Sequence, residues 1–142
     1  MEQITSRSNP LMTHLRKLGS SHSYRAKTGE YLGDSGKLFQ EAIRWGAELT
    51  AVVCTQGSEL PQLPAGVRAV EVPRGLMEYI SPMETPQGLL FSARRPSAGL
   101  PGELTGKRYL ALEGVQDPGN VGTILRTADA FEADGLFLLT GC

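Results

Sequence analysis

The side chains with the clearest chemical potential gather in one run of the 142-residue chain, residues 109–131. An apolar segment is followed by a turn rich in Gly, Asn and Asp, and then by a helical pattern that contains one arginine, Arg126. Asp117 is a good N-cap and Pro118 a good first helical residue, so we expect the helix to begin at Pro118. Its free backbone N–H groups would face the turn, and such a helix end attracts anions and carbonyl-rich ligands.

Arg126 is the second element of this predicted site. It lies four residues after Gly122, and because helical side chains lean toward the N-terminus, it should reach back over the space that the glycine leaves open. A guanidinium group stays charged and offers paired donors to phosphate, but it is a poor general base. The alternative is an ordinary helix cap with Arg126 paired to Asp129 or Glu132.

The opposite side of this helix is apolar. Residues 121, 124, 125, 128 and 131 share one stripe at helical spacing, and we expect this stripe to pack against a sheet. The glycines of the turn do not fit a dinucleotide fingerprint, and no P-loop lysine follows them.

The elements that must support this run alternate between helices and strands, which indicates the α/β class. Helices are predicted over residues 8–19, 35–46, 73–80 and 118–131, and strands over residues 49–55, 67–72, 88–93, 108–112 and 135–140. Gly19 is expected to stop the first helix, and Trp45 is interpreted as a packing residue at the end of the second. The predicted organisation is a domain over residues 1–95, a Pro/Gly-rich linker over 96–107 and a second unit over 108–142.

Composition narrows the function classes. With 40% hydrophobic and 20% charged residues, the chain reads as globular, and it has neither a membrane-length apolar run nor a secretion signal, which favours the cytoplasm. Cys54 and Cys142 show no metal-ligand spacing, so no metal is expected.

The net charge of −1 conceals a basic N-terminal segment. This segment is typical either of contact with a polyanion or of a solvated helix face. The candidate RNA-binding residues are Arg7, Asn9, Arg16, Lys17, Arg25 and Lys27. Tyr24 and Tyr31 lie close enough in sequence to stack on bases or simply to pack.

Residues 112–131 resemble motif 1 of the SpoU (TrmH-type) RNA 2′-O-ribose methyltransferases of the SPOUT superfamily, whose N-x-G-x-x-x-R core falls on Asn120, Gly122 and Arg126. Upstream, residues 4–10, 31–36 and 81–90 are similar to the L30e-like substrate-binding domain of many members. The resemblance implies an α/β fold: an N-terminal L30e-like α/β/α domain plus the first strand–helix–strand unit of the knotted, Rossmann-like SPOUT domain.

The family transfers a methyl group from S-adenosylmethionine to a ribose 2′-hydroxyl of rRNA or tRNA, usually as a homodimer. By resemblance, the catalytic residues would be Arg126, which would help to activate or position the target ribose and its phosphate, and Asn120, which would shape the same pocket. The residues that would support motif 1 are Glu113, Asp117, Gly119 and Gly122.

The sequence also departs from the family. Motifs 2 and 3, which form the knot and the cofactor pocket, do not follow before Cys142, and Glu132 stands where relatives commonly carry glycine. We therefore expect no cofactor-binding residues in this chain, no activity of the chain alone, and an exposed edge at strand 135–140. Two other hypotheses stay open: a non-catalytic module that binds structured RNA, and a small nucleotide-binding protein that uses residues 117–122 for phosphate.

Overall fold

The computed structural model describes residues 1–58, 60, 62–96 and 99–142. The chain divides into two compact units, Met1–Ser97 and Ala98–Cys142. Both are built from helices and strands, so the predicted α/β class is confirmed. Of the predicted linker, residues 97 and 98 lie outside the described residues, and residues 99–107 form neither helix nor strand.

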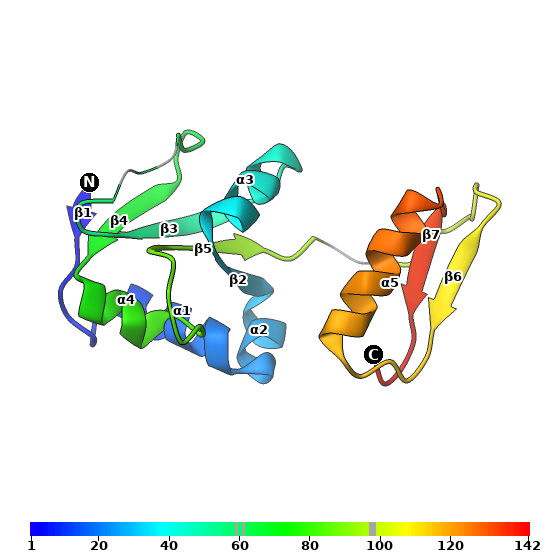
Figure 1. Ribbon diagram of the computed structural model, residues 1–142, viewed down its shortest axis with the longest axis horizontal. Helices are drawn as coiled ribbons and strands as arrows, with labels where there is room; N and C mark the ends of the chain where they lie inside the picture. The colour runs from blue at the N-terminus through cyan, green and yellow to red at the C-terminus, as the bar shows by residue number, and fades with distance from the viewer. Residues whose placement is uncertain (59, 61, 97–98) are drawn as a thin grey trace. The chain divides into compact units, whose positions relative to one another are not determined.

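A five-stranded mixed sheet forms the centre of the N-terminal unit (Figure 1). In order across the sheet, its strands are β1 (Glu2–Gln3), β4 (Arg68–Val72), β3 (Leu49–Thr55), β5 (Leu89–Arg94) and β2 (Glu30–Asp34). β1, β4 and β3 run parallel to one another, whereas β5 runs antiparallel to both of its neighbours, β3 and β2. β2 is the last strand in this order and is therefore an edge strand. The runs of Val, Leu and Phe in β3 and β5 are buried, as expected of central strands.

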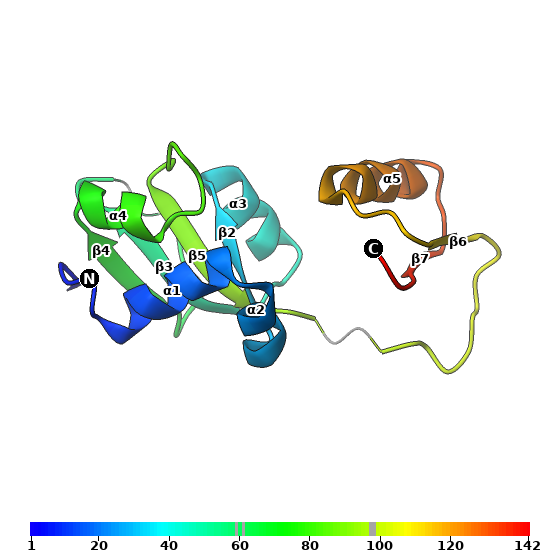
Figure 2. The same ribbon diagram turned by 90° about the horizontal axis from the view of Figure 1, so that it is seen from below.

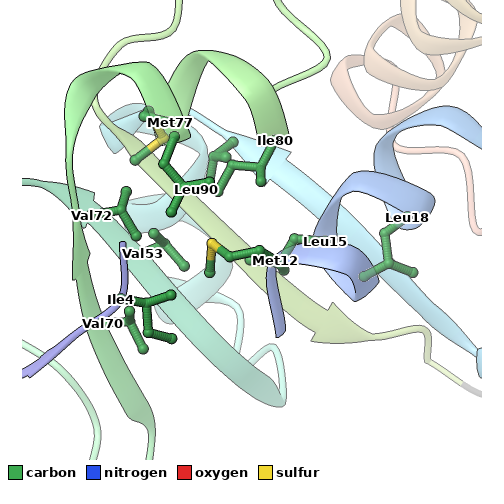
Figure 3. Close-up of a cluster of buried hydrophobic side chains, with 11 residues drawn as sticks. Ile4, Met12, Leu15, Leu18, Val53, Val70, Val72, Met77, Ile80 and Leu90 are labelled. Atoms are coloured by element: carbon green, nitrogen blue, oxygen red, sulfur yellow. The ribbon is translucent and has the colours of Figure 1, made fainter. Parts of the chain in front are cut away.

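Helices cover both faces of this sheet. They are α1 (Pro10–Ser20), α2 (His22–Thr28), α3 (Gly36–Arg44) and α4 (Arg74–Ile80). Figures 1 and 2 show α1, α2 and α4 on one face and α3 on the other. The first face is filled by α1 and α4 side chains, among them Met12, Leu15 and Met77, which point toward Val53 and Leu90 of the sheet (Figure 3). On the second face, Phe39 of α3 packs with Phe91 in an edge-on arrangement, 5.6 Å between ring centroids.

One prediction about α1 was wrong, and the helix that follows it was not predicted. Gly19 does not end the helix, because α1 continues through Ser20. Instead, a Cβ at Gly19 would lie 3.3 Å from the side chain of Leu32, so the glycine allows α1 to approach β2 closely. A further helix, α2, follows at once and is capped by the side chain of Ser21, which accepts from the Tyr24 N–H at 3.2 Å.

The outer side of α3 also differs from expectation. Trp45, interpreted as a packing residue, is 78% exposed, and Leu38 is 54% exposed. The helix covers the sheet through the adjacent positions Phe39, Ala42 and Ile43. Nine residues present only a narrow stripe inward, so Leu38 and Trp45 fall outside it.

The C-terminal unit is a two-stranded parallel sheet with one helix. β6 (Tyr109–Leu112) and β7 (Gly135–Leu138) pair along their whole length, and α5 (Pro118–Ala130) connects them. The element types match the sequence prediction.

The apolar stripe of α5 is only partly covered. Ala128 is the buried residue of α5. Leu125 is 52% and Phe131 72% exposed, so the prediction that the whole apolar stripe packs against a sheet was wrong for these two. Two strands are too narrow a surface to cover it.

Candidate functional site

The amino end of α5 is built as the sequence predicts. Asp117 is the N-cap: its carboxylate accepts a hydrogen bond from the Gly119 N–H at 2.8 Å, and Pro118 is the first helical residue. Pro118 has no N–H, and the Val121 N–H donates to the Asp117 carbonyl at 3.1 Å. Within the described residues, the Asn120 N–H is therefore the amide of the first turn that is left for a ligand. This end of the helix therefore offers a partial positive charge to a ligand.

Arg126 lies over Gly122, as expected. A Cβ placed on Gly122 would be 3.9 Å from one terminal nitrogen of Arg126, which is van der Waals contact. The other terminal nitrogen makes a long, 3.5 Å contact with the hydroxyl of Thr123. The guanidinium group is thus held along the helix toward its amino end while the residue stays exposed.

The alternative pairing of Arg126 is not observed. Among the described residues, neither Asp129 nor Glu132 forms an ion pair with it; the carboxylate of Glu132 lies 3.8 Å from Arg108 instead. Arg108 also donates to the backbone carbonyl of Glu132 at 3.2 Å. The positive charge of Arg126 is therefore available to a ligand in the part of the chain described.

The other motif residues lie between the end of β6 and the first turn of α5. Glu113 directly follows β6, Asn120 lies in the first turn of α5, and both are exposed. Gly114 adopts a φ of +68°, a conformation that suits glycine, and its N–H donates to the Thr140 carbonyl at 3.3 Å. The turn is thereby tied to the segment that follows β7.

A carboxylate at the other end of this unit fixes the start of β6. Asp134 accepts hydrogen bonds from the backbone N–H groups of Lys107 and Arg108, both at 2.8 Å. These donors, Arg108 first, hold the pKa of Asp134 below its usual value. The strands that carry the candidate site are therefore joined at their opposite ends by Asp134 and Gly114.

The basic residues of the N-terminal segment contact different partners. The guanidinium groups of Arg7 and Arg16 both lie over the ring of Tyr79, 4.6 and 3.9 Å from its centroid. Tyr79 belongs to α4, and nothing near residues 7–16 in the sequence could have pointed to it. Among the described residues, neither arginine forms an ion pair. They form a cationic cluster, which we call the Tyr79 cluster.

The remaining candidates do not join this cluster in any contact that the structure shows. Asn9 is the N-cap of α1 and accepts from the Leu11 N–H at 2.9 Å. Arg25 donates to the Leu18 carbonyl at 2.7 Å, which joins α2 to the end of α1. Lys17 lies 5.6 Å from the ring centroid of Tyr24, and Lys27 is exposed.

Both tyrosines that were considered for stacking are partly buried. The Tyr24 hydroxyl bonds to His14 at 2.9 Å, and the other ring nitrogen of His14 bonds to Glu30 at 2.7 Å. Tyr31 packs edge-on against Phe91. Their rings are engaged in the fold, so the packing interpretation holds for both.

Two cavities lie in the C-terminal unit. One, of about 520 Å³, is lined mainly by residues 99–105 and 134–138, and the other, of about 300 Å³, lies between α5 and β6. Neither Asn120 nor Arg126 lines either cavity.

Comparison with protein families gives two matches. Residues 107–142 match the SpoU rRNA methylase family, and residues 9–90, more than half of the chain, match the MRM3-like substrate binding domain. The match to the substrate binding domain contains Arg16 and Tyr79 of the Tyr79 cluster but not Arg7. The match to the SpoU family contains the turn after β6 and, in α5, Arg126. None of the helices in the described part of the chain is long and apolar enough to cross a membrane.

Individual relatives agree with these matches. The chain is 29% identical to the 23S rRNA (guanosine(2553)-2′-O)-methyltransferase RlmP of Bacillus subtilis, over 99% of this chain and 56% of that protein. An AdoMet-bound rRNA methyltransferase from Sinorhizobium meliloti superposes with a TM-score of 0.78 at 28% identity, covering 96% of this chain and 54% of that one.

A putative RNA methyltransferase of the TrmH family from Porphyromonas gingivalis superposes with a TM-score of 0.76 at 32% identity, covering 94% of this chain and 53% of that one. The chain thus spans little more than half the length of these relatives. The chain belongs to the family of the MRM3-like substrate binding domain, and its residues 107–142 match the SpoU rRNA methylase family model.

Proposed function

We propose that this chain forms the RNA-binding domain and the first catalytic motif of an RNA 2′-O-ribose methyltransferase that uses S-adenosylmethionine and modifies rRNA or tRNA. The observation that carries the proposal is the position of Arg126 over Gly122 at the amino end of α5, in a segment that matches the SpoU rRNA methylase family. The proposed site residues are Arg126 and Asn120, supported by Glu113, Asp117, Gly119 and Gly122.

The chemistry explains why an arginine belongs there. A ribose hydroxyl is a weak nucleophile, so the negative charge that develops on its oxygen must be stabilised or its proton accepted. Arg126 supplies a permanent charge and paired donors that can hold the ribose and the adjacent phosphate. Its guanidinium group has no ion-pair partner among the described residues, so no internal contact competes for the substrate. Arg126 acts as a positioning and charge-stabilising group and not as the free base.

The cofactor requires a further segment. S-adenosylmethionine supplies the methyl group in the family, and the AdoMet-bound relative is covered over only 54% of its length. Because neither cavity of the C-terminal unit contains Asn120 or Arg126, the 142-residue chain alone should not bind S-adenosylmethionine or transfer methyl groups. Isothermal titration tests this: micromolar binding to the 142-residue chain would contradict it. The complete enzyme is proposed to be a cytoplasmic homodimer.

RNA recognition is proposed for the N-terminal unit, through the Tyr79 cluster. Guanidinium groups stacked on an aromatic ring stay charged and are restrained in position, so less entropy is lost when they bind phosphate. The Ser6 and Ser8 hydroxyls, 2.8 Å apart beside Arg7, add neutral hydrogen-bonding groups. The cluster therefore suits the backbone of a structured RNA.

A salt series with single variants tests the RNA-binding role. Arg7→Ala or Arg16→Ala should weaken binding of an rRNA fragment and flatten the dependence of log K on log salt by roughly one unit each. Arg68→Ala is the matched control, because this arginine is already bound to Glu2 through two hydrogen bonds of 2.8 and 2.9 Å. Fluorescence anisotropy measures both quantities. Unchanged affinity and slope in both cluster variants would remove this face from RNA recognition.

A further inference from the structure

An open cavity lies on the other face of the N-terminal sheet, away from the Tyr79 cluster. Its volume is about 830 Å³, within the range of roughly 300–1,000 Å³ that is typical of small-molecule sites. It is lined mainly by apolar groups of α3, β2 and β5, including Tyr31, Ala42 and Phe91. Of the candidate residues described above, Tyr31 lines it, with its ring packed against Phe91, and the proposed function leaves this cavity without a role.

Trp45 and Leu38 line this cavity, and both side chains are exposed. Exposed apolar residues are common singly, but here two large ones border the same hollow. The indole N–H of Trp45 donates to the carboxylate of Glu41 at 3.1 Å, one helical turn earlier. This bond restrains the indole by its edge, and the 78% exposure of the residue leaves ring surface available for stacking.

The charges around the indole favour an anionic partner. The guanidinium carbon of Arg44 lies 5.7 Å from the indole ring centroid, and Arg94 and Arg95 line the cavity. Of the two acidic residues of the lining, Glu48 is paired with Arg94 at 2.8 Å, whereas Glu41 accepts from the neutral indole N–H and keeps its charge. Arg44, Arg94 and Arg95 together still outnumber these two carboxylates.

Arg44 and Arg95, by contrast, form no ion pair within the described residues. The two unneutralised arginines beside an exposed indole are the combination that proteins use for single-stranded nucleic acid, with bases on the aromatic ring and phosphates on the arginines.

We propose that this cavity, the Trp45 site, binds an unpaired nucleobase of an RNA, stacked on the indole, while Arg44 and Arg95 contact the flanking phosphates. The inference rests on the proposed function, since it takes RNA as the ligand. It adds a contact on the sheet face opposite α1. The cavity includes residues 31–33 of the edge strand β2.

Trp45 is the single tryptophan of the chain, so its intrinsic fluorescence reports on this site without a label. The 142-residue chain is titrated with an unstructured RNA of roughly eight nucleotides, a length within the range of about 4–16 nucleotides that single-strand-binding domains cover. We expect saturable quenching of the tryptophan emission. The same titration with a mononucleotide should need a much higher concentration, because it lacks the flanking phosphates.

Variants measured with a labelled oligonucleotide complete the test. Trp45→Ala should weaken binding by about 5- to 150-fold, the range expected for one base–aromatic stack, and Trp45→Phe should retain part of the affinity. Phe131→Ala is the control, because it removes an equally exposed aromatic ring from the other unit and should change nothing. Arg95→Ala should reduce the salt dependence by roughly one unit.

Four outcomes would overturn the inference. Oligonucleotide binding by anisotropy with unchanged tryptophan emission would place the RNA elsewhere and leave the proposed function standing. Equal affinity for a mononucleotide would make the site one for free nucleotides. A blue shift of the emission with protein concentration, in the absence of RNA, would show that a second copy of the chain covers Trp45. Failure of every RNA to bind would instead contradict the proposed function as well.

Discussion

Arg7, Arg16 and Arg25 belong to one basic segment, yet the structure gives them different partners. The sequence shows their charges but not the partner of each, because Tyr79 and the Leu18 carbonyl are brought to them by the tertiary fold. Arg126 could be placed from the sequence because its geometry is local: the lean of a helical side chain and a glycine four residues earlier determine it. The position of a side chain could be predicted when it depends on the geometry of one helix. It could not be predicted when the partner belongs to a second element that only the tertiary fold brings close.

Arg25 gives a prediction at this scale. Its hydrogen bond to the Leu18 carbonyl joins α2 to α1, so Arg25→Ala should lower the free energy of unfolding by about 1 kcal/mol. Lys27→Ala, on the exposed side of the same helix, is the control and should leave stability unchanged. Urea unfolding followed by circular dichroism compares the two. Equal stability of both variants would show that the hydrogen bond makes no net contribution.

At the scale of elements, periodicity was sufficient for helices with an apolar face, including the short α4, and for the apolar strands, and it failed for α2 and β2. β3, read as residues 49–55, has those bounds. α2 was missed because seven residues with no buried side chain carry little apolar pattern. β2 was missed because Gly33 interrupts its pattern, and the glycine is required there by the ring of Phe91.

Gly33 gives the prediction at this scale. A Cβ at this position would overlap the Phe91 ring, which the core beneath α3 holds in place. Gly33→Ala should therefore destabilise the N-terminal unit by about 1–3 kcal/mol, the usual range for an overpacked core. Gly36→Ala, where nothing lies within 4 Å of the new Cβ, is the matched control. If thermal unfolding gives the same midpoint for both variants, β2 and β5 are not packed as described.

For the whole molecule, the two units differ in how much apolar surface they bury. Two clusters of buried side chains hold the five-stranded sheet from both faces, whereas two strands and one helix form the C-terminal unit, which leaves Leu125, Phe131 and Leu138 exposed. A two-stranded sheet is marginal on its own. The sequence predicted the elements of this unit but not their exposure, because a helical stripe does not reveal how wide a sheet it will meet.

This difference predicts unequal protection in the 142-residue chain. Amide hydrogens of β6 and β7 should exchange roughly tenfold faster or more than those of β3 and β5, because they open without unfolding the larger core. Hydrogen exchange read by mass spectrometry measures both sets in one sample. Equal protection of the two units would mean that they unfold as one.

The proposed function, in which this chain helps transfer a methyl group to an RNA ribose, is tested most directly by methyl transfer itself. The product of the complete reading frame is incubated with rRNA and S-adenosylmethionine labelled in the methyl group, and the RNA is digested to nucleosides. We predict label in a 2′-O-methylated nucleoside, and a fall of about 10²–10³ in its rate with Arg126→Ala at unchanged RNA affinity. Label on a base, or full activity without Arg126, would contradict the account.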